Sequence, residues 1–310
     1  MSNILVIKHG ALGDIVLATA PFQAIREHHK GAHITLLTTA PYADMLRESG
    51  YFDEIWVDKR PKPYQLLSFL KLLKTIRKGN FARIYDLQSS ERTSWYFKFM
   101  REPRPEWVGA AEGASHHHGI PKGAMLHSSE RQRKQLEVAG IFNLPAPNID
   151  WLTSDLSRFK LPEHYVLIAA GGSSHRPGKR WPASHYGELC EWLVKHDIMP
   201  VLIGTKAEAS VISTIEALCP QAINLIGRTD FADVAELARH AKGAIGNDTG
   251  PIHLIAVTGC PTLVLFSQFS NPTLCAPRGK NVMVMQESCL AKLQPETVIK
   301  KAQAFLQAKA

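Results

Sequence analysis

A single carboxylate in a glycine-containing loop near the start of the chain has the chemistry of a general base. Asp14 follows Gly10 and Gly13 in the stretch KHGALGD, directly after an apolar run at 4–7. Glycine lets the backbone turn sharply and lets a ligand approach it closely. A carboxylate within hydrogen-bonding reach of a substrate hydroxyl can accept its proton. The plain structural alternative is that Asp14 only caps a helix, because Asp is a favoured N-cap residue.

The glycines of this loop do not form a dinucleotide-binding fingerprint. The pattern G-x-x-G-D differs from G-x-G-x-x-G, and the strand expected at 33–38 is followed by Thr39 and Ala40 instead of an acidic residue. The sequence therefore disfavours a dehydrogenase of the Rossmann type.

A loop in the second half of the chain carries groups that bind phosphate. The segment 171–182, GGSSHRPGKRWP, combines glycines with the hydroxyls of Ser173 and Ser174 and with three cations, among them Lys179. Backbone N–H groups, hydroxyls and a lysine ammonium can all hold phosphate oxygens. A solvated basic turn is the alternative interpretation.

A second polar loop, GNDTGPIH at 246–253, has the features of a helix start. Pro251 suits the first position of a helix, whose N-terminus offers free N–H groups and the positive end of a dipole to an anion. Capping of that helix by Asp248 or Thr249 would use the same donors. His253 would lie one turn into the helix, where a structural role is the alternative to ligand binding.

The elements that must position these loops alternate between strands and helices in both halves of the chain. In the first half, the pattern predicts strands at 4–8, 33–38, 54–57 and 82–87, and helices at 15–28, 43–48, 64–78, 93–101 and 131–139. In the second half, it predicts strands at 165–169, 199–203, 222–225, 244–246, 262–266 and 282–285, and helices at 186–195, 208–218, 231–240, 251–258 and 295–309.

Such alternation favours an α/β fold with parallel, doubly wound sheets. The pattern weakens at 102–129, where we expect loops around one short strand, and a Pro-containing segment at 143–148 predicts the start of a linker. We therefore expect two domains, 1–150 and 151–310, that face a central cleft, with ligands outside the carboxyl ends of the strands. For the last helix, 295–309, packing against the first domain is an alternative to packing within the second.

The composition fits a cytoplasmic globular protein with an anionic partner. Lys and Arg number 36 against 28 Asp and Glu, giving a net charge of +8, which suits nucleic acid, acidic lipid or a phosphorylated substrate, or simply a soluble surface. The five cysteines are scattered without a CxxC pair, which favours reduced thiols. We expect neither a signal peptide nor a transmembrane segment.

The segment 59–83 is the most basic part of the chain, with eight Lys or Arg and no acidic residue. Its helix is amphipathic, and Lys71 and Lys74 are among its polar positions. Contact with an acidic glycolipid or with the anionic inner leaflet of a membrane is one interpretation, and a solvated helix face is the other. The run of three histidines at 116–118 is expected to lie in a loop and not to hold a metal.

Four motifs, in this order, resemble the ADP-heptose:lipopolysaccharide heptosyltransferases, glycosyltransferase family 9. They are LGD in the first loop, KRWP at 179–182, the G-x-x-x-E loop at 204–208 and DTGPIHL at 248–254. The resemblance covers nearly the whole chain. It implies the GT-B fold, two Rossmann-like domains with the active site between them, and transfer of a sugar, with inversion, from a nucleotide donor to the inner core of lipopolysaccharide.

The resemblance also implies roles for individual residues. It assigns Asp14 the role of general base. From the residues themselves, we expect Gly10 and Gly13 to keep this loop open to the acceptor, and the basic helix with Lys71 and Lys74 to contact an acidic acceptor. Taken alone, Glu208 is a weak signal for ribose binding, because an acidic residue is also favoured in the first turn of a helix. On the donor side, the resemblance assigns the diphosphate to Lys179, the ribose to Glu208, the adenine to the backbone at Thr229, and the sugar with the diphosphate to Asp248, Thr249 and Gly250, with His253 beside them. The hydroxyls of Ser173 and Ser174 are expected to bind the diphosphate because they share a loop with Lys179.

Other functions remain open from the sequence. They are a GT-B transferase that uses another nucleotide sugar, such as a UDP-sugar, for a cell-envelope glycan, and a nucleotide-sugar-binding protein without turnover. A nucleic-acid-binding protein is disfavoured, because the basic residues come without an aromatic stacking run or a fold signature. Since the chain lacks a D-x-D motif, we expect catalysis without an obligatory metal and without another cofactor.

Overall fold

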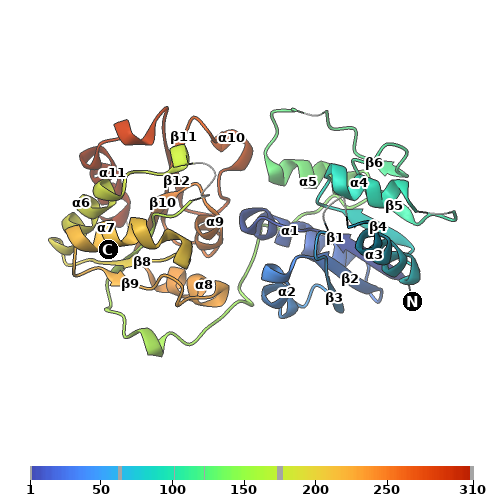
Figure 1. Cartoon of the computed structure of the whole chain (residues 1–310), viewed down its shortest axis with the longest axis horizontal. Coiled ribbons are helices and arrows are strands. Elements are labelled where there is room, and N and C mark those ends of the chain that lie inside the picture. The colour runs from blue at the N-terminus through green and yellow to red at the C-terminus, as the bar shows by residue number, and fades with distance from the viewer. Residues whose placement is uncertain (1, 62–64, 101, 122, 173–176, 308–310) are drawn as a thin grey trace. The chain divides into compact units, whose positions relative to one another are not determined.

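The structure is a computed structural model of the 310-residue chain, and it describes residues 2–61, 65–100, 102–121, 123–172 and 177–307. The chain divides into two compact units, Met1–Asn148 and Ile149–Ala310. In Figure 1 the first unit runs from blue to green and the second from yellow-green to red. Each unit is built on one sheet with helices on its faces.

The first unit contains a parallel sheet of six strands in the order β3-β2-β1-β4-β5-β6. This is the order of doubly wound nucleotide-binding folds, in which the chain turns outward in both directions from its first strand. Its strands are β1 (Asn3–Ile7), β2 (His33–Thr38), β3 (Glu54–Val57), β4 (Arg83–Asp86), β5 (Glu106–Gly109) and β6 (His116–His117). Its helices are α1 (Leu12–His28), α2 (Ala40–Arg47), α3 (Leu66–Lys78), α4 (Glu91–Lys98) and α5 (Ser128–Glu137).

The second unit repeats this topology, with a parallel sheet in the order β12-β11-β10-β7-β8-β9. Its strands are β7 (Tyr165–Ala169), β8 (Met199–Leu202), β9 (Ile223–Asn224), β10 (Gly243–Asn247), β11 (Thr262–Ser267) and β12 (Val282–Glu287). Its α-helices are α6 (Ala183–Val194), α7 (Ala209–Leu218), α8 (Phe231–His240), α9 (Gly250–Val257), α10 (Pro272–Cys275) and α11 (Pro295–Gln307). Single 3₁₀ turns lie at Ser157–Phe159, Pro177–Lys179, Lys206–Glu208 and Leu290–Lys292.

The central strands carry continuous apolar sequences because helices cover both faces of each sheet. All five residues of β7, in the sequence YVLIA, are buried, and so are the last four of β1, ILVI. The two expected doubly wound sheets are therefore confirmed, and the GT-B fold class with them. The carboxyl ends of β1, β4, β7, β8 and β10 lead into the loops that carry the candidate site residues.

Some expected elements differ from the observed ones. Helix α2 begins at Ala40, three residues earlier than expected, because Pro41 occupies the first turn of the helix. The prediction of a loop at the histidine run is wrong, since His116 and His117 form β6, which pairs with Val108 and Gly109. The region 102–129 thus holds two short strands instead of one.

Packing of the last helix, α11, against the first domain was one of two expected arrangements. The packing that the structure shows for α11 is against α6, with the side chains of Val298, Ala302 and Leu306 in the core of the second unit. Among the described residues, no helix is both long and apolar enough to cross a membrane.

Candidate functional site

Asp14 lies in the first turn of α1 and not at its N-cap. The helix starts at Leu12, and Ala11 is the N-cap residue. One carboxylate oxygen, Oδ2, accepts a hydrogen bond from the backbone N–H of Ala11 at 3.2 Å, and no described residue donates to Oδ1. Asp14 therefore supports the helix start with one oxygen, and the other has no donor among the described residues.

The loop before Asp14 is held by buried contacts from several elements. The His9 ring lies 3.1 Å from the carboxylate of Asp58, its backbone N–H donates to Gln88, and its carbonyl accepts from Thr39. Burial would raise the pKa of Asp58, but the neighbouring His9 ring and the hydrogen bond from the Tyr96 hydroxyl lower it. These anchors fix the loop from which α1 begins.

Gly10 is required by the geometry of this loop. Its φ angle is +122°, a region that side chains rarely permit, and a Cβ atom here would lie 2.4 Å from Cε2 of Tyr42. Gly13 is buried in the first turn of α1. The expected role of Gly10 in letting the loop turn is consistent with this geometry, whereas acceptor binding by either glycine stays a prediction.

A pocket of about 300 Å³ lies beside Asp14 at the carboxyl ends of β1 and β4. Lys8 lines it with only 5% of its surface exposed and donates from Nζ to the Leu87 carbonyl at 3.2 Å. Burial lowers the pKa of Lys8, and the charges of Asp14 and Asp86 oppose this. The other lining residues are Leu87, Gln88, Ser89, Ala110, His118, Ile120, Pro121, Ser128, Arg131, Gln132 and Gln135.

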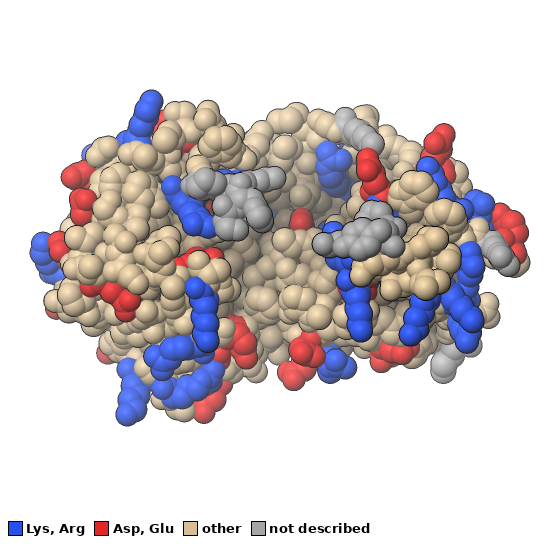
Figure 2. Space-filling view, in the orientation of Figure 1, with Lys and Arg blue, Asp and Glu red and all other residues tan. Residues whose placement is uncertain are grey.

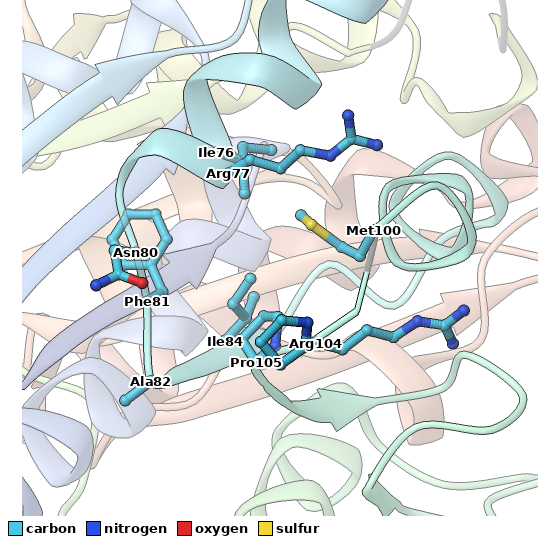
Figure 3. Close-up of a pocket in the computed structure, with 10 residues that line it drawn as sticks. Ile76, Arg77, Asn80, Phe81, Ala82, Ile84, Met100, Arg104 and Pro105 are labelled. Atoms are coloured by element: carbon cyan, nitrogen blue, oxygen red, sulfur yellow. The ribbon is translucent and has the colours of Figure 1, made fainter.

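A second pocket, of about 360 Å³, lies at the opposite, amino ends of β4 and β5 (Figure 3). Its wall is largely apolar, with Ile76, Phe81 and Ile84, and the side chains of Arg77 and Arg104 extend on either side of Met100. Ligands of parallel α/β sheets bind at the carboxyl ends of the strands. This pocket is therefore not a candidate for the chemistry.

In the second unit, Lys179 and Asp248 form an ion pair. The Nζ atom of Lys179 lies 2.9 Å from Oδ2 of Asp248 and 3.0 Å from the Ser270 hydroxyl, which also donates to Asp248. Burial opposes the charge on Asp248, but the nearby His253 ring and the hydrogen bonds from Ser270 and Lys179 lower its pKa to about 2. The carboxylate is thus ionised, and it joins the turn at Pro177–Lys179 to the loop that precedes α9.

Side-chain capping of α9 by Asp248 or Thr249, the alternative to anion binding, is not observed. Thr249 is the N-cap residue by position, but its side chain makes no capping hydrogen bond, and Asp248 binds Lys179 and Ser270 instead. Gly250 is the first helical residue. His253 is buried, with Nε2 at 3.9 Å from Oδ1 of Asp248.

Glu208 occupies the first-turn position that was the alternative to ribose binding. Its Oε2 accepts from the backbone N–H of Thr205 at 2.8 Å and from the Thr205 hydroxyl at 2.6 Å. A Cβ atom on Gly171 would lie 2.8 Å from Cγ of Glu208, so the carboxylate also lies against the loop after β7. Ribose binding remains a prediction.

The remaining predicted residues make no described contact with the groups around Asp14 or around Lys179 and Asp248. Thr229 is half-buried and precedes Asp230, the N-cap of α8. Lys71 and Lys74 are exposed on α3. Ser173 and Ser174 lie outside the described residues.

Asn247 is a residue of this site that sequence reasoning did not single out. It is fully buried at the end of β10 and donates to the carbonyls of Ala170 and Gly171 at 2.9 and 3.0 Å. Its Oδ1 accepts from the backbone N–H of Trp181 and the hydroxyl of Tyr186. The sequence feature that could have revealed Asn247 is a polar residue at the end of an apolar strand. Asn247 fixes both ends of the loop that carries Lys179.

Both units thus carry polar groups at the carboxyl ends of their strands: a carboxylate beside a pocket in the first, and a lysine with a helix N-terminus in the second. A sequence model described as glycosyltransferase family 9 (heptosyltransferase) matches residues 69–303. The chain belongs to this family.

Individual members of the family match this chain over different lengths. Lipopolysaccharide heptosyltransferase 2 of Escherichia coli K12 is 28% identical over 310 residues, which cover 92% of this chain and 88% of that protein. Lipooligosaccharide heptosyltransferase 2 of Haemophilus influenzae is 27% identical over 115 residues. This match covers 36% of this chain and 33%, about a third, of that protein. The solved structure of E. coli ADP-heptose lps heptosyltransferase II has a TM-score of 0.82, 22% identity and 100% coverage of both chains.

Proposed function

We propose that this chain transfers a heptose, with inversion, from ADP-heptose to an inner-core sugar of lipopolysaccharide. The observation that carries the proposal is the family match over residues 69–303. The names of the relatives, which are heptosyltransferases of lipopolysaccharide or lipooligosaccharide, support this donor and acceptor.

In the proposed reaction, an acceptor hydroxyl attacks the anomeric carbon of the donor as the bond to the diphosphate breaks. Asp14 accepts the hydroxyl proton through its free Oδ1, a step that typically contributes about 10²–10⁴-fold to the rate. The ADP leaves with the bonding electron pair and gains negative charge. Lys179 and the backbone N–H groups at Thr249 and Gly250 stabilise this charge.

The rest of the donor is assigned to the second unit. Glu208 would bind the ribose, and the backbone at Thr229 would meet the adenine. Ser173 and Ser174 would contribute hydroxyls to the diphosphate, and His253 would lie beside the transferred sugar. Because the chain lacks a D-x-D motif, the proposal includes no obligatory metal and no further cofactor.

The donor is tested by the thermal stability of the chain with ADP-, UDP- and GDP-sugars. A ligand at 100 times its Kd stabilises the folded state by about 2.7 kcal/mol, so ADP-heptose is expected to raise Tm and the other nucleotide sugars are not. Release of ADP that requires both ADP-heptose and acceptor, and that continues in a chelator, would support metal-independent transfer. Stabilisation by a UDP-sugar instead would favour another transferase, and binding of donor without ADP release would favour a non-catalytic protein.

We also propose peripheral contact with the cytoplasmic face of the inner membrane, through a surface made by α3 and α4. Phe69 of α3 and Phe99 at the end of α4 pack edge to face with their centroids 5.9 Å apart, so the two helices adjoin. Trp95 stacks on Phe99 at 5.6 Å although both are about half exposed. The exposed apolar side chains of this α3–α4 surface are Leu66, Leu67, Leu70, Trp95 and Phe99.

Basic residues accompany these apolar side chains. Lys71, Lys74 and Lys78 are exposed on α3, and Nζ of Lys98 lies 5.6 Å from the centre of the Trp95 ring. Figure 2 shows Lys and Arg side chains projecting where Figure 1 places α3. Apolar and aromatic side chains next to lysines are typical of surfaces that lie in an anionic membrane interface.

Reversing two charges on this surface should weaken membrane binding. Each Lys or Arg near an anionic membrane contributes about 1 kcal/mol, so Lys71→Glu with Lys74→Glu is expected to reduce binding to phosphatidylglycerol-containing vesicles by about tenfold or more. Co-sedimentation measures this, and Lys30→Glu with Arg47→Glu, two exposed cations on other parts of the first unit, is the control. Equal binding of both variants, or equal binding of the wild type to uncharged vesicles, would contradict the proposal.

A further inference from the structure

The pocket beside Asp14 contains more hydrogen-bond donors and positive charge than proton transfer requires. Lys8, His118 and Arg131 line it together with Asp14. We propose that this pocket binds a compact anionic group, a carboxylate or a phosphate, on the acceptor sugar, and that Arg131 selects acceptors by that charge. The inference rests on the proposed function and extends it to a subsite of the acceptor.

Arg131 is held in place and keeps donors available. It lies in the first turns of α5, and its Nη2 donates to the carbonyl of Ala124 at 2.6 Å, which fixes one edge of the guanidinium group. Within the described part of the chain, no carboxylate pairs with Arg131 and its other side-chain N–H groups have no acceptor. A guanidinium group in this state matches the planar, bidentate geometry of a carboxylate or phosphate.

His118 supplies an uncharged donor next to Arg131. Its Nδ1 accepts a hydrogen bond from the backbone N–H of Ile120 at 3.0 Å, so the proton of the neutral ring is assigned to Nε2. Burial lowers the pKa of His118, as do the neighbouring charges of His117 and Arg131. The ring is therefore neutral at pH 7, and its Nε2–H group remains a donor at that pH.

Two buried groups indicate that the pocket is built for a polar ligand. The ammonium group of Lys8 has three N–H donors, and the one described acceptor for them is the Leu87 carbonyl. Gln132 is only 5% exposed, and its Oε1 accepts no hydrogen bond from any described residue. An amide oxygen of this kind suits a sugar hydroxyl, and the cations suit the anionic group on the same sugar.

Lys8 also makes an anion compatible with the base. An acceptor carboxylate or phosphate next to Asp14 would repel its negative charge, and Lys8 lies close enough to Asp14 for the two charges to interact. Among the residues that line the pocket, Lys8 and Arg131 carry positive charge and Asp14 carries negative charge, and the buried Asp86 also interacts with Lys8. Arg131, which has no described carboxylate partner, is therefore the cation available to balance the anion.

The test compares two substitutions on α5 with matched acceptors. Arg131→Met removes the proposed contact, while Arg133→Met removes a neighbouring cation that pairs with Glu130 and Glu137 at 2.8 Å, outside the pocket. The acceptors are a deacylated core oligosaccharide, the same oligosaccharide with its carboxyl groups reduced, and the same treated with phosphatase. Heptose transfer from ADP-heptose gives kcat/KM for each pair, and Tm confirms folding.

We expect Arg131→Met to lower kcat/KM for the untreated acceptor roughly 10- to 100-fold, as for loss of charge-assisted hydrogen bonds. The loss should disappear with either the carboxyl-reduced or the phosphatase-treated acceptor, which identifies the group that is bound. Arg133→Met should resemble the wild type with every acceptor, and the ADP-heptose affinity of Arg131→Met should be unchanged.

An equal loss by Arg131→Met with all three acceptors would overturn the inference. If Arg131→Met does not fold, the wild type decides, because equal kcat/KM for the untreated acceptor and for both modified acceptors would also overturn it. Failure of the wild type to transfer heptose to any acceptor would refute the proposed function instead.

Discussion

Replacing Asp14 by Asn is expected to reduce kcat by about 10²–10⁴-fold, the range for loss of a general base, without weakening donor binding. The amide cannot accept the proton of the attacking hydroxyl. The donor is assigned to residues of the second unit, so its Kd should be unaffected. Initial rates of ADP release give kcat, and calorimetric titration of ADP-heptose gives Kd.

The choice of Asn separates catalysis from the structural role of the same side chain. Asn retains a side-chain oxygen that can accept the hydrogen bond from the backbone N–H of Ala11, which lies 3.2 Å from Oδ2 of Asp14. We therefore expect a change in unfolding free energy below about 1 kcal/mol, the typical value for loss of a cap. Asp44→Asn, which neutralises a highly exposed carboxylate on α2, is the matched control. Near-wild-type turnover by Asp14→Asn would remove Asp14 from the mechanism.

The elements that the sequence predicted best are those whose signals are local. The strand expected at 165–169 and the helix expected at 231–240 are observed as Tyr165–Ala169 and Phe231–His240. In the helix, Asp230 accepts from the backbone of Asp233 at 2.8 Å, and Asp233 accepts from the backbone of Asp230 at 2.9 Å. This reciprocal cap lies within four residues, so a reader of the sequence alone can find it.

The start of α1 shows why other boundaries were missed. The helix was expected to begin at Ile15, with Asp14 at its start, but it begins at Leu12. The loop before it is fixed by contacts of His9 with Asp58 and Gln88, which lie far along the chain. Local propensity could not reveal these contacts, and they outweigh the preference of Asp for an N-cap position.

The same limit applies to the candidate site. The motifs drew attention to Lys179 and Asp248, but their contact joins residues 69 positions apart, and their common partner Ser270 lies outside every motif. Arg131 likewise reaches the pocket of Asp14 from a helix that carries no motif residue. Spacing within a motif identifies chemistry, whereas pairing between loops depends on the packing of the sheet that holds them.

The pairing of Lys179 with Asp248 makes two effects of Lys179→Met separable. Loss of a cation from the proposed diphosphate site is expected to reduce turnover by about 10²–10³-fold, as for loss of one group that stabilises transition-state charge. The substitution also leaves the Asp248 carboxylate without its ammonium partner, and the Asp248 side chain is only 9% exposed. Removing one partner of a buried pair costs about 3–5 kcal/mol, and we expect about 2–3 here because both side chains retain some exposure.

The pH dependence follows from the lowered pKa of Asp248, about 2 in the folded chain. A depressed carboxyl pKa contributes stability above the unfolded-state pKa, near 3.9, and this contribution is lost as the pH falls toward 2. Without Lys179 the pKa of Asp248 rises, since the desolvation by burial is no longer opposed by the ammonium group. The stability difference between wild type and Lys179→Met should therefore be largest near pH 7 and shrink as Asp248 becomes protonated in the variant.

Adding Asp248→Asn to Lys179→Met distinguishes the structural effect from the functional one. The double variant has no unpaired charge, and the amide oxygen introduced by Asp248→Asn can still accept a hydrogen bond from Ser270, so urea unfolding should show most of the lost stability recovered. Affinity for ADP and turnover should stay low, because the diphosphate still lacks its cation. Recovery of turnover together with stability would show that Lys179 acts only by pairing with Asp248, and the stabilisation of the departing diphosphate would then fall to the N-terminus of α9.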